Sequence, residues 1–223
     1  MALQRRIAIC VTGVGLLLGV SSILAPWQTA HAAQGPSLSQ SDIATILDQG
    51  DAAAAITLSD LRTVNGTAQP TRMHIAVVAR DGKFLDIRSM DDAWVGSIDI
   101  AIAKGRTASF FSSNQNALTS KAIGELTQAH DPHLGVPRAG IGPAGPLWGL
   151  GNSNQIGISG SQEYRNGIIT FAGGLPLYKG GVLVGGVGVS GDSVVKDQIV
   201  ALAAAVGFAP PANISQAGFG LDF

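Results

Sequence analysis

Residues 171–191 read FAGGLPLYKGGVLVGGVGVSG, and this glycine-rich stretch carries the strongest structural signal in the chain. Its second half, Val182–Val189, alternates branched apolar residues with glycine and predicts a buried strand that a helix or a ligand approaches closely. Gly186, Gly188 and Gly191 also match the GxGxxG spacing of dinucleotide-binding proteins. That fingerprint needs a further parallel strand and an acidic residue about 20 positions on, which the proline-rich sequence that follows does not supply. We therefore reject a nucleotide site here.

The sequence on either side of this stretch alternates loop and helix patterns. Ser193–Val206 predicts a helix with Ser193 as its N-cap. Ser193 and Lys196 also have the SxxK spacing of a serine nucleophile, but no SDN or KTG partner follows, so we prefer the N-cap. On the N-terminal side, Gly167–Phe171 predicts a strand. It is preceded by His130–Gln162, a loop rich in glycine and proline whose length is typical of functional loops.

The first half of the chain has equally clear periodicities. We expect a helix over Ser39–Leu61, a hairpin of strands 72–80 and 84–88 around an Asp81-Gly82 turn, and helices over Asp92–Phe111 and Ala117–Gln128. This order of helix, hairpin, helices, two strands and helix predicts an α+β fold, in which helices cover the faces of a mostly antiparallel sheet.

The N-terminus has the three regions of a secretory signal peptide. Arg5 and Arg6 precede the apolar run Ile7–Val20, and Ala30-His31-Ala32 provides a small-residue cleavage site. We therefore expect residues 1–32 to be removed, residues 33–38 to form a linker and the protein to be secreted or periplasmic. A retained membrane anchor is the alternative, and it is disfavoured because a span needs about 20 strongly apolar residues.

Cleavage would change both the thiol content and the charge. Cys10, the single cysteine, would be lost, which excludes disulfides and thiolate chemistry from the mature chain. Loss of Arg5 and Arg6 would lower the 14 basic residues to 12 against 15 acidic ones, and the net charge from −1 to −3, which disfavours nucleic acid as a partner. With 13% charged residues and 30 glycines, the weakly charged surface favours burial between subunits, so we expect a homo-oligomer.

Two groups of side chains have the chemistry of a ligand site. His130 and His133 offer two imidazoles to a metal ion or to heme iron, and a solvated loop is the alternative. Lys104, Arg106 and Phe110 place cations and an aromatic ring on one predicted helix. Such a face suits a flat anionic ligand, although an ordinary half-exposed helix uses the same residues.

Residues 171–191 also carry a family resemblance, together with the segments IAVVARDG (75–82) and DIAIAKGRTAS (99–109). These motifs resemble the GlcG/HbpS family, also called DUF336 or the heme-degrading domain. The resemblance covers residues 39–208, with 130–162 as a long loop insert and 209–223 as a C-terminal tail. It implies a PAS- or profilin-like sandwich that assembles into oligomers and that in several members binds heme.

The resemblance also implies roles for individual residues, because heme iron needs an axial donor and the porphyrin needs apolar contacts. The candidate donors are His74, His130, His133, Tyr164, Tyr178 and Thr107, although His74 taken alone is interpreted as a hydrogen-bonded structural histidine. The candidates for ring contacts are Phe110, Phe111, Phe171 and Trp148. Lys104 or Arg106 would pair with a propionate, and Gly173 and Gly174 of the FxGGxP motif belong to the same cofactor-binding set.

The sequence thus predicts an exported, oligomeric protein that binds heme or a similar flat molecule, for sequestration or sensing, with a membrane sensor or redox protein as a partner. Two alternatives stay open. One is a weak heme-degrading or accessory oxidoreductase enzyme, and the other is a scaffolding oligomer without a small ligand.

Overall fold

The computed structural model of the protein describes residues 35–127 and 167–221. In chain order these residues form α1 (Gln40–Ile56), β1 (Leu58–Val64), β2 (Thr67–Pro70), β3 (His74–Ala79), β4 (Phe84–Ser89), α2 (Ser97–Phe111), β5 (Asn116–Leu118), α3 (Ser120–Thr127), β6 (Gly174–Lys179), β7 (Val182–Ser190), α4 (Val194–Ala204) and β8 (Ser215–Ala217). The signal peptide predicted for residues 1–32 and the insert predicted for residues 130–162 lie outside the described residues.

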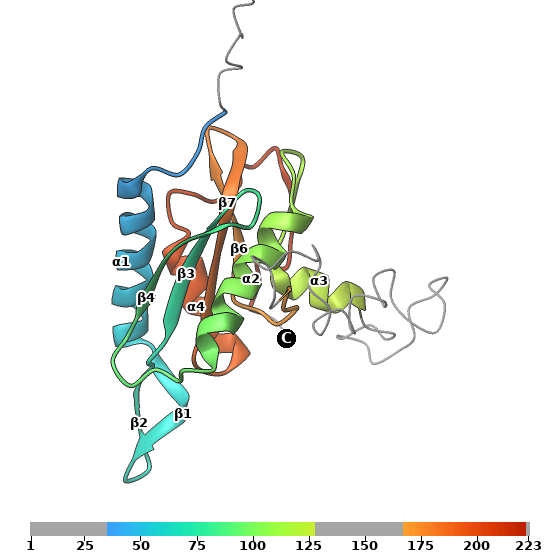
Figure 1. Ribbon diagram of the computed structural model, residues 1–223. Coiled ribbons are helices and arrows are strands. Elements are labelled where there is room, and N and C mark those ends of the chain that lie inside the picture. The colour runs from blue at the N-terminus through green and yellow to red at the C-terminus, as the bar shows by residue number, and fades with distance from the viewer. Residues whose placement is uncertain (1–34, 128–166, 222–223) are drawn as a thin grey trace, which may run out of the picture. The chain divides into compact units, whose positions relative to one another are not determined.

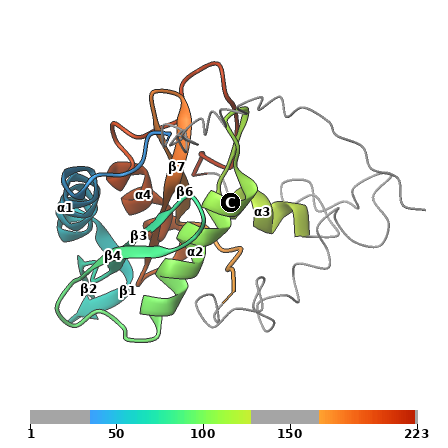
Figure 2. The same cartoon turned by 45° about the horizontal axis from the view of Figure 1, so that its top comes forward.

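The centre of the fold is a four-stranded antiparallel sheet in the order β4-β3-β7-β6. Helices α1 and α4 pack against each other and against one face, and α2 packs across β3, β7 and β6 on the other (Figures 1 and 2). The period-two alternation of strands explains this division. Ile75, Val77, Val187 and Val189 point into the core shared with α1 and α4, and the residues between them face α2. The predicted α+β fold with helices on both faces of an antiparallel sheet is confirmed.

Where α2 crosses β7, the face of the sheet is made of backbone rather than of side chains. A Cβ atom at Gly188 would collide with the Ala101 carbonyl, and one at Gly186 with the Gly105 carbonyl. Gly105 of α2 is itself in contact with β7, because a Cβ there would lie 3.2 Å from the Gly188 nitrogen. The glycine-rich strand predicted from the sequence is therefore the surface on which a helix lies directly.

The first helix is shorter than predicted. Ser39 caps α1 in a reciprocal capping box with Asp42, as the sequence suggests, but the helix ends at Ile56 instead of Leu61. The following residues form the β1–β2 hairpin, whose turn is Asn65-Gly66 with φ values of 50° and 78°. Asn-Gly is the residue pair that a two-residue hairpin turn favours, since both positions need positive φ.

Three further predictions are corrected by the structure. The helix predicted over Ala117–Gln128 starts at Ser120, because Asn116–Leu118 form strand β5, which pairs with β8. The helix predicted from Asp92 starts at Ser97, after Gly96 at the N-cap. The strand predicted over Gly167–Phe171 is wrong: residues 167–170 have no regular secondary structure, and the strand is β6, Gly174–Lys179. The backbone before β6 is instead bound by side chains from neighbouring helices, as described below.

The C-terminal segment packs on its own domain. Strand β8 pairs in parallel with β5, and the Gly218 carbonyl accepts hydrogen bonds from Thr119 Oγ1 at 2.9 Å and Gln198 Nε2 at 3.0 Å. The described part of the predicted tail 209–223 is thus attached to the helices that flank the glycine-rich motif. In the described ranges, no helix combines the length and the apolar character needed to cross a membrane.

We predict that Gly188→Ala destabilises the protein by at least about 2 kcal/mol, because the added methyl group must push α2 away from β7. Urea unfolding followed by circular dichroism measures the loss. Gly96→Ala is the control: a methyl group at Gly96 would meet no atom within 4 Å, and this replacement should cost about 1 kcal/mol or less. Equal losses in the two variants would contradict the direct contact between helix and strand.

Candidate functional site

The FxGGxP motif is preceded by a segment, residues 167–173, that is held by buried side chains. The hydroxyl of Thr107 on α2 binds both main-chain polar groups of Ile169. It accepts a hydrogen bond from the Ile169 N–H at 3.1 Å and can donate one to the Ile169 carbonyl at 2.7 Å. A third partner, the Ala103 carbonyl, lies 2.9 Å from the same hydroxyl. Because these groups pair with a helix side chain, the segment does not need a strand neighbour.

The two motif glycines are bound in the same way from two other helices. Ser120, the first residue of α3, donates to the Phe171 carbonyl at 2.5 Å and accepts the Gly174 N–H at 2.8 Å. Gln198 of α4 accepts the Gly173 N–H at 2.9 Å. The motif is therefore tied to α2, α3 and α4 at once, which fixes the backbone on which Phe171 stands.

Glycine is required at both positions for steric reasons. Gly173 has φ +106°, and a Cβ atom there would lie 2.7 Å from the Val189 carbonyl and 2.9 Å from the Asp197 Cβ. A Cβ atom at Gly174 would collide with the Lys104 carbonyl. The structure thus gives these predicted site residues a packing role: they let the motif lie against α2 and β7.

A buried ion pair lies directly behind Gly173. Lys104 Nζ donates to Asp197 Oδ2 at 2.6 Å and to the Val189 carbonyl at 3.0 Å, and the two side chains are only 1% and 3% exposed. The second carboxylate oxygen accepts the Asp192 N–H at 3.1 Å. Burial lowers the pKa of Lys104 and raises the pKa of Asp197, while their mutual attraction opposes both changes.

This arrangement offers a ligand an apolar surface rather than a free charge. Lys104 and Thr107 are hydrogen-bonded and closed off from solvent, whereas Phe171 is 56% exposed. An exposed ring on a backbone fixed by three helices can contact a flat apolar molecule at little cost in conformational entropy. Of the predicted site residues, the structure brings together Lys104, Thr107, Phe171 and the two glycines.

Arg106 and Phe110 face a different part of the protein, the turn between β3 and β4. Arg106 Nε donates to the Gly82 carbonyl at 3.0 Å. The Phe110 ring packs over Gly82, where a Cβ atom would collide with it. Both side chains thus stabilise the turn, and neither contacts the FxGGxP segment through any of these interactions.

His74 lies in β3 and is 3% exposed. Its Nε2 lies 2.9 Å from the Trp94 carbonyl, which can only accept, so Nε2 carries the proton and Nδ1 accepts from Ser89 Oγ at 2.8 Å. Burial lowers the pKa of His74, with the Trp94 carbonyl opposing that change. Both ring nitrogens are occupied, which matches the structural role expected from its strand position and leaves no nitrogen for iron.

The predicted metal ligands His130 and His133, and the candidates Trp148 and Tyr164, lie outside the described residues. Within residues 35–127 and 167–221, no cluster of three or more His, Cys, Asp or Glu side chains has the geometry to hold a metal ion.

Sequence reasoning missed Ser120, Gln198 and the pairing of Asp197 with Lys104. Each of these residues is polar but lies on an otherwise buried, apolar face of its helix. A polar residue at a buried position needs a hydrogen-bond partner, and this is the signal by which they could have been found. The sequence suggests Lys104 as a cation for an external anion, whereas its carboxylate partner comes from α4.

Comparison with known proteins places this α+β architecture in a family. The chain belongs to the family described as "Haem degrading protein HbpS-like", whose model matches residues 51–206. It is 32% identical over 126 residues to the "Uncharacterized 15.0 kDa protein in dhaT-dhaS intergenic region" of Citrobacter freundii, an overlap of 56% of this chain and 68% of that protein.

Two solved structures have the same fold. The DUF336 protein ORFY of Klebsiella pneumoniae is 25% identical, with a TM-score of 0.53 over 78% of this chain and 93% of its own. The structure described as a PduOC:heme complex is 22% identical, with a TM-score of 0.54 over 78% of this chain and 96% of its own. These likenesses agree with the family resemblance inferred from the motifs.

We predict that Lys104→Met costs about 3–5 kcal/mol of unfolding free energy, because it leaves the Asp197 carboxylate buried without its ammonium partner. The double variant Lys104→Met/Asp197→Asn should lose less than the sum of the two single variants, and a double-mutant cycle in urea measures this coupling. Lys179→Met is the matched control. Its pair with Asp42 is also 2.6 Å long but is 35% and 18% exposed, so its loss should cost about 1 kcal/mol or less. Similar losses in both lysine variants would contradict the assignment of a buried pair.

We predict that His74 makes the fold less stable as the pH falls below about 6.5. The pKa of His74 is lowered in the folded state, so on acidification the unfolded chain binds the proton before the folded chain does. Proton binding therefore stabilises the unfolded state relative to the folded state. The unfolding free energy of the native protein should therefore decrease from pH 7.5 to 5.5 more steeply than that of His74→Gln. Parallel profiles would show that His74 is not held neutral.

Proposed function

We propose that this protein binds heme. The observation that carries the proposal is its membership of the HbpS-like family over residues 51–206, with the FxGGxP motif intact and Phe171 exposed beside it. The likeness in fold to a PduOC:heme complex supports the same ligand. Phe171 would contact the porphyrin, and the fixed backbone around Gly173 and Gly174 would hold that ring in place.

The described residues fit the porphyrin better than they fit its iron. Three candidate axial donors are engaged elsewhere. His74 uses both nitrogens, the Thr107 hydroxyl binds Ile169, and the buried Tyr178 hydroxyl donates to the Ser113 carbonyl at 2.7 Å. Burial also raises the pKa of Tyr178, which disfavours the phenolate that iron binds.

By elimination among the candidates, an axial ligand would come from the segment between the described ranges. That segment contains His130, His133 and Tyr164, so we retain the two histidines as the proposed metal ligands. When bound, heme would supply an iron centre able to take an axial ligand or change oxidation state. The residues described above would position the ring and keep their own polar groups paired.

We infer that the protein works outside the cytoplasm as a homo-oligomer, in heme sequestration or sensing, with a membrane sensor or redox protein as partner. The signal-peptide pattern of residues 1–32 supports export. The mass of the mature chain from a secreting host would test removal of those residues. The family description favours heme degradation as the second candidate function, and release of iron under a reductant and oxygen would distinguish degradation from storage.

We predict a saturable Soret band when hemin is added to micromolar protein. At least one of His130→Ala, His133→Ala and Tyr164→Phe should shift or abolish that band, because it removes the axial donor. Tyr178→Phe and His74→Gln are the controls and should keep the native spectrum, since both groups are engaged inside the fold. No saturable band in the native protein would refute heme binding. A native band lost only in His74→Gln would refute the assignment of the ligand.

A further inference from the structure

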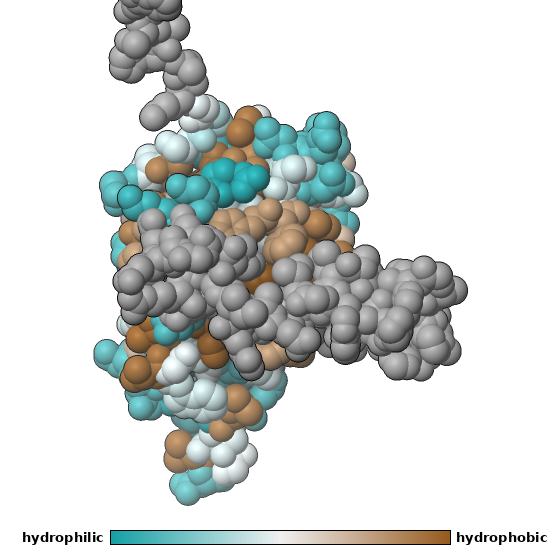
Figure 3. Space-filling model, turned by 45° about the vertical axis from the view of Figure 1, so that its right-hand side comes forward, coloured by the Kyte–Doolittle hydropathy of each residue, from teal (hydrophilic) through white to brown (hydrophobic). Residues whose placement is uncertain are grey.

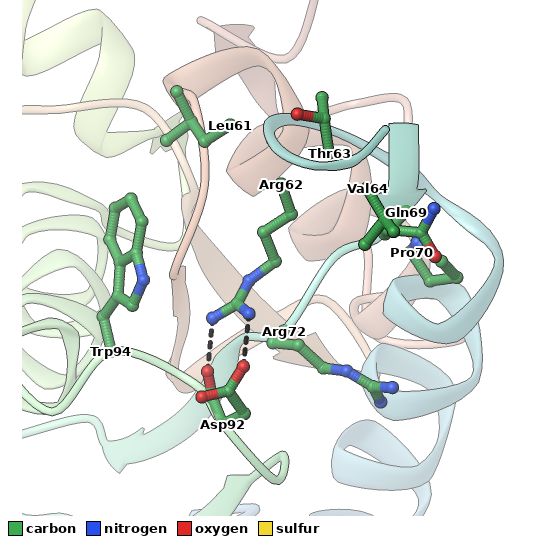
Figure 4. A pocket seen from close by; sticks show the side chains of 9 residues that line it. All are labelled: Leu61, Arg62, Thr63, Val64, Gln69, Pro70, Arg72, Asp92 and Trp94. Carbon is green, nitrogen blue, oxygen red and sulfur yellow. Dashed lines mark hydrogen bonds and ion pairs between the residues drawn. The ribbon is translucent and has the colours of Figure 1, made fainter. Parts of the chain in front are cut away.

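The β1–β2 hairpin and the loop before α2 carry much of the protein's exposed apolar surface. Of the eleven large apolar side chains that are exposed in the described ranges, six lie within residues 56–64 and 94–95. Leu61, Val64 and Trp94 are 51%, 57% and 50% exposed, and they line one hollow of about 480 Å³ beside the hairpin (Figure 4). Apolar atoms are also visible at the lower end of the molecule in Figure 3, where the hairpin lies. Apolar surface gathered in this way marks a place of contact with another molecule.

The side chains around the hollow are spread over its width and do not converge on one point. In Figure 4 the Arg62–Asp92 pair lies in the middle, with Trp94 on one side and the Arg72 guanidinium pointing away on the other. Arg62 Nη1 lies 2.7 Å from Asp92 Oδ2, and Nη2 donates to the Asp92 carbonyl. A small ligand on the indole would therefore not reach the Arg72 charge, whereas the surface of a protein can contact both sides of the pair at once.

The hairpin projects from the lower end of the domain and is held there at its base (Figure 1). Ser59 donates to Asp192 Oδ2, the Asp60 N–H donates to Asp192 Oδ1 at 2.9 Å, and Ser193 Oγ donates to Asp60 Oδ2 at 2.5 Å. Among the described strands, β1 and β2 pair only with each other. Since a two-stranded hairpin is only marginally stable in water by itself, its exposed apolar side chains gain stability when a partner surface covers them.

The edges of this hairpin are unsuited to the addition of another strand. The register of β1 shifts between Leu58 and Thr63, and Pro70 of β2 has no N–H to donate. Bulges and prolines are features that keep edge strands from pairing with other chains. A partner is therefore expected to dock on the side chains and not to extend the sheet.

Two charges of opposite sign flank one backbone hydrogen bond next to the hollow. The Met90 N–H donates to the Met73 carbonyl at 3.0 Å, and Arg72 and Asp91 are the adjacent residues on the two segments. Both are exposed, and neither side chain has a hydrogen bond or ion pair with a residue of the described ranges. A two-fold rotation can bring the cation of one copy to the carboxylate of the other, and the reverse, so this pair of charges is complementary to itself.

We propose that the hairpin surface, formed by Leu61, Val64 and Trp94 with Arg72 and Asp91 beside them, is where two copies of this chain meet around a two-fold axis. The apolar side chains of the two copies pack together, and each Arg72 pairs with Asp91 of the partner subunit. A second copy is favoured over a different protein because the two free charges match each other. The inference rests on the homo-oligomer proposed above and names the surface of one of its interfaces.

Analytical ultracentrifugation of the purified protein tests the apolar part of this surface. Val64→Glu should weaken association by about tenfold or more, because it buries a carboxylate without a partner. Val206→Glu is the matched control: Val206 is 60% exposed and lies after α4, outside the hairpin surface, so association should stay native. Circular dichroism checks that both variants are folded. Native association of Val64→Glu, or equal weakening in both variants, would overturn the proposal.

A charge exchange tests the two-fold pairing independently of Val64. Arg72→Glu and Asp91→Arg, each measured alone, should weaken association because each brings like charges together across the axis. An equal mixture of the two variants should recover association, since every contact in the mixed dimer again joins opposite charges. Only a contact between copies can give this recovery, and its absence would overturn the two-fold arrangement.

The two proposals fail in different ways. A native protein that is monomeric at every concentration measured would refute the homo-oligomer and this surface together, and would leave the surface to a different protein. A native oligomer that Val64→Glu and both charge variants leave intact would keep the homo-oligomer and overturn only the hairpin surface.

Discussion

Helix α2 lies directly on the backbone of β7 and β6, and most of the structure depends on that close contact. Side chains normally separate a helix from the strands beneath it, but Gly174, Gly186 and Gly188 leave only main-chain atoms at their positions on β6 and β7. Because α2 lies so close to the sheet, Lys104 of α2 extends past the end of β7 to the carboxylate of Asp197 on α4. A side chain at any of these glycines would move α2 away from the sheet and separate Lys104 from Asp197.

The buried pair of Lys104 and Asp197 then links the two helical layers through the end of the sheet. Two charges removed from water are stable only when both are well paired and hydrogen-bonded, and the Val189 carbonyl and the Asp192 N–H complete that set. Gly173 lies against the pair because it has no side chain. The FxGGxP motif therefore allows close packing of the helices, and it holds the backbone of the exposed Phe171 in a fixed position.

Sequence patterns predicted the parts of the fold whose signals are local. The Ser39 and Ser193 caps, the Asp81-Gly82 hairpin and the glycine-rich strand are all set by neighbours within a few residues. The strand prediction for residues 167–171 is wrong because their apolar character is local, whereas their hydrogen-bond partners on α2 and α3 are distant in sequence. The β1–β2 hairpin was not predicted, although Asn65-Gly66 is a typical hairpin turn. The apolar periodicity of α1 continues to Leu61, so the start of β1 was assigned to the helix.

The antiparallel α+β architecture, the family and the glycine-rich strand could be read from the residues, because periodicity and the absence of side chains are local properties. The role of each polar side chain, in contrast, became visible only in the folded chain. Lys104 is a buried partner of Asp197 rather than a free cation, His74 has both nitrogens occupied, and Arg72 is left without a partner in the described ranges. The physical reason is that charge pairing and burial depend on segments that are far apart along the chain and meet only on folding.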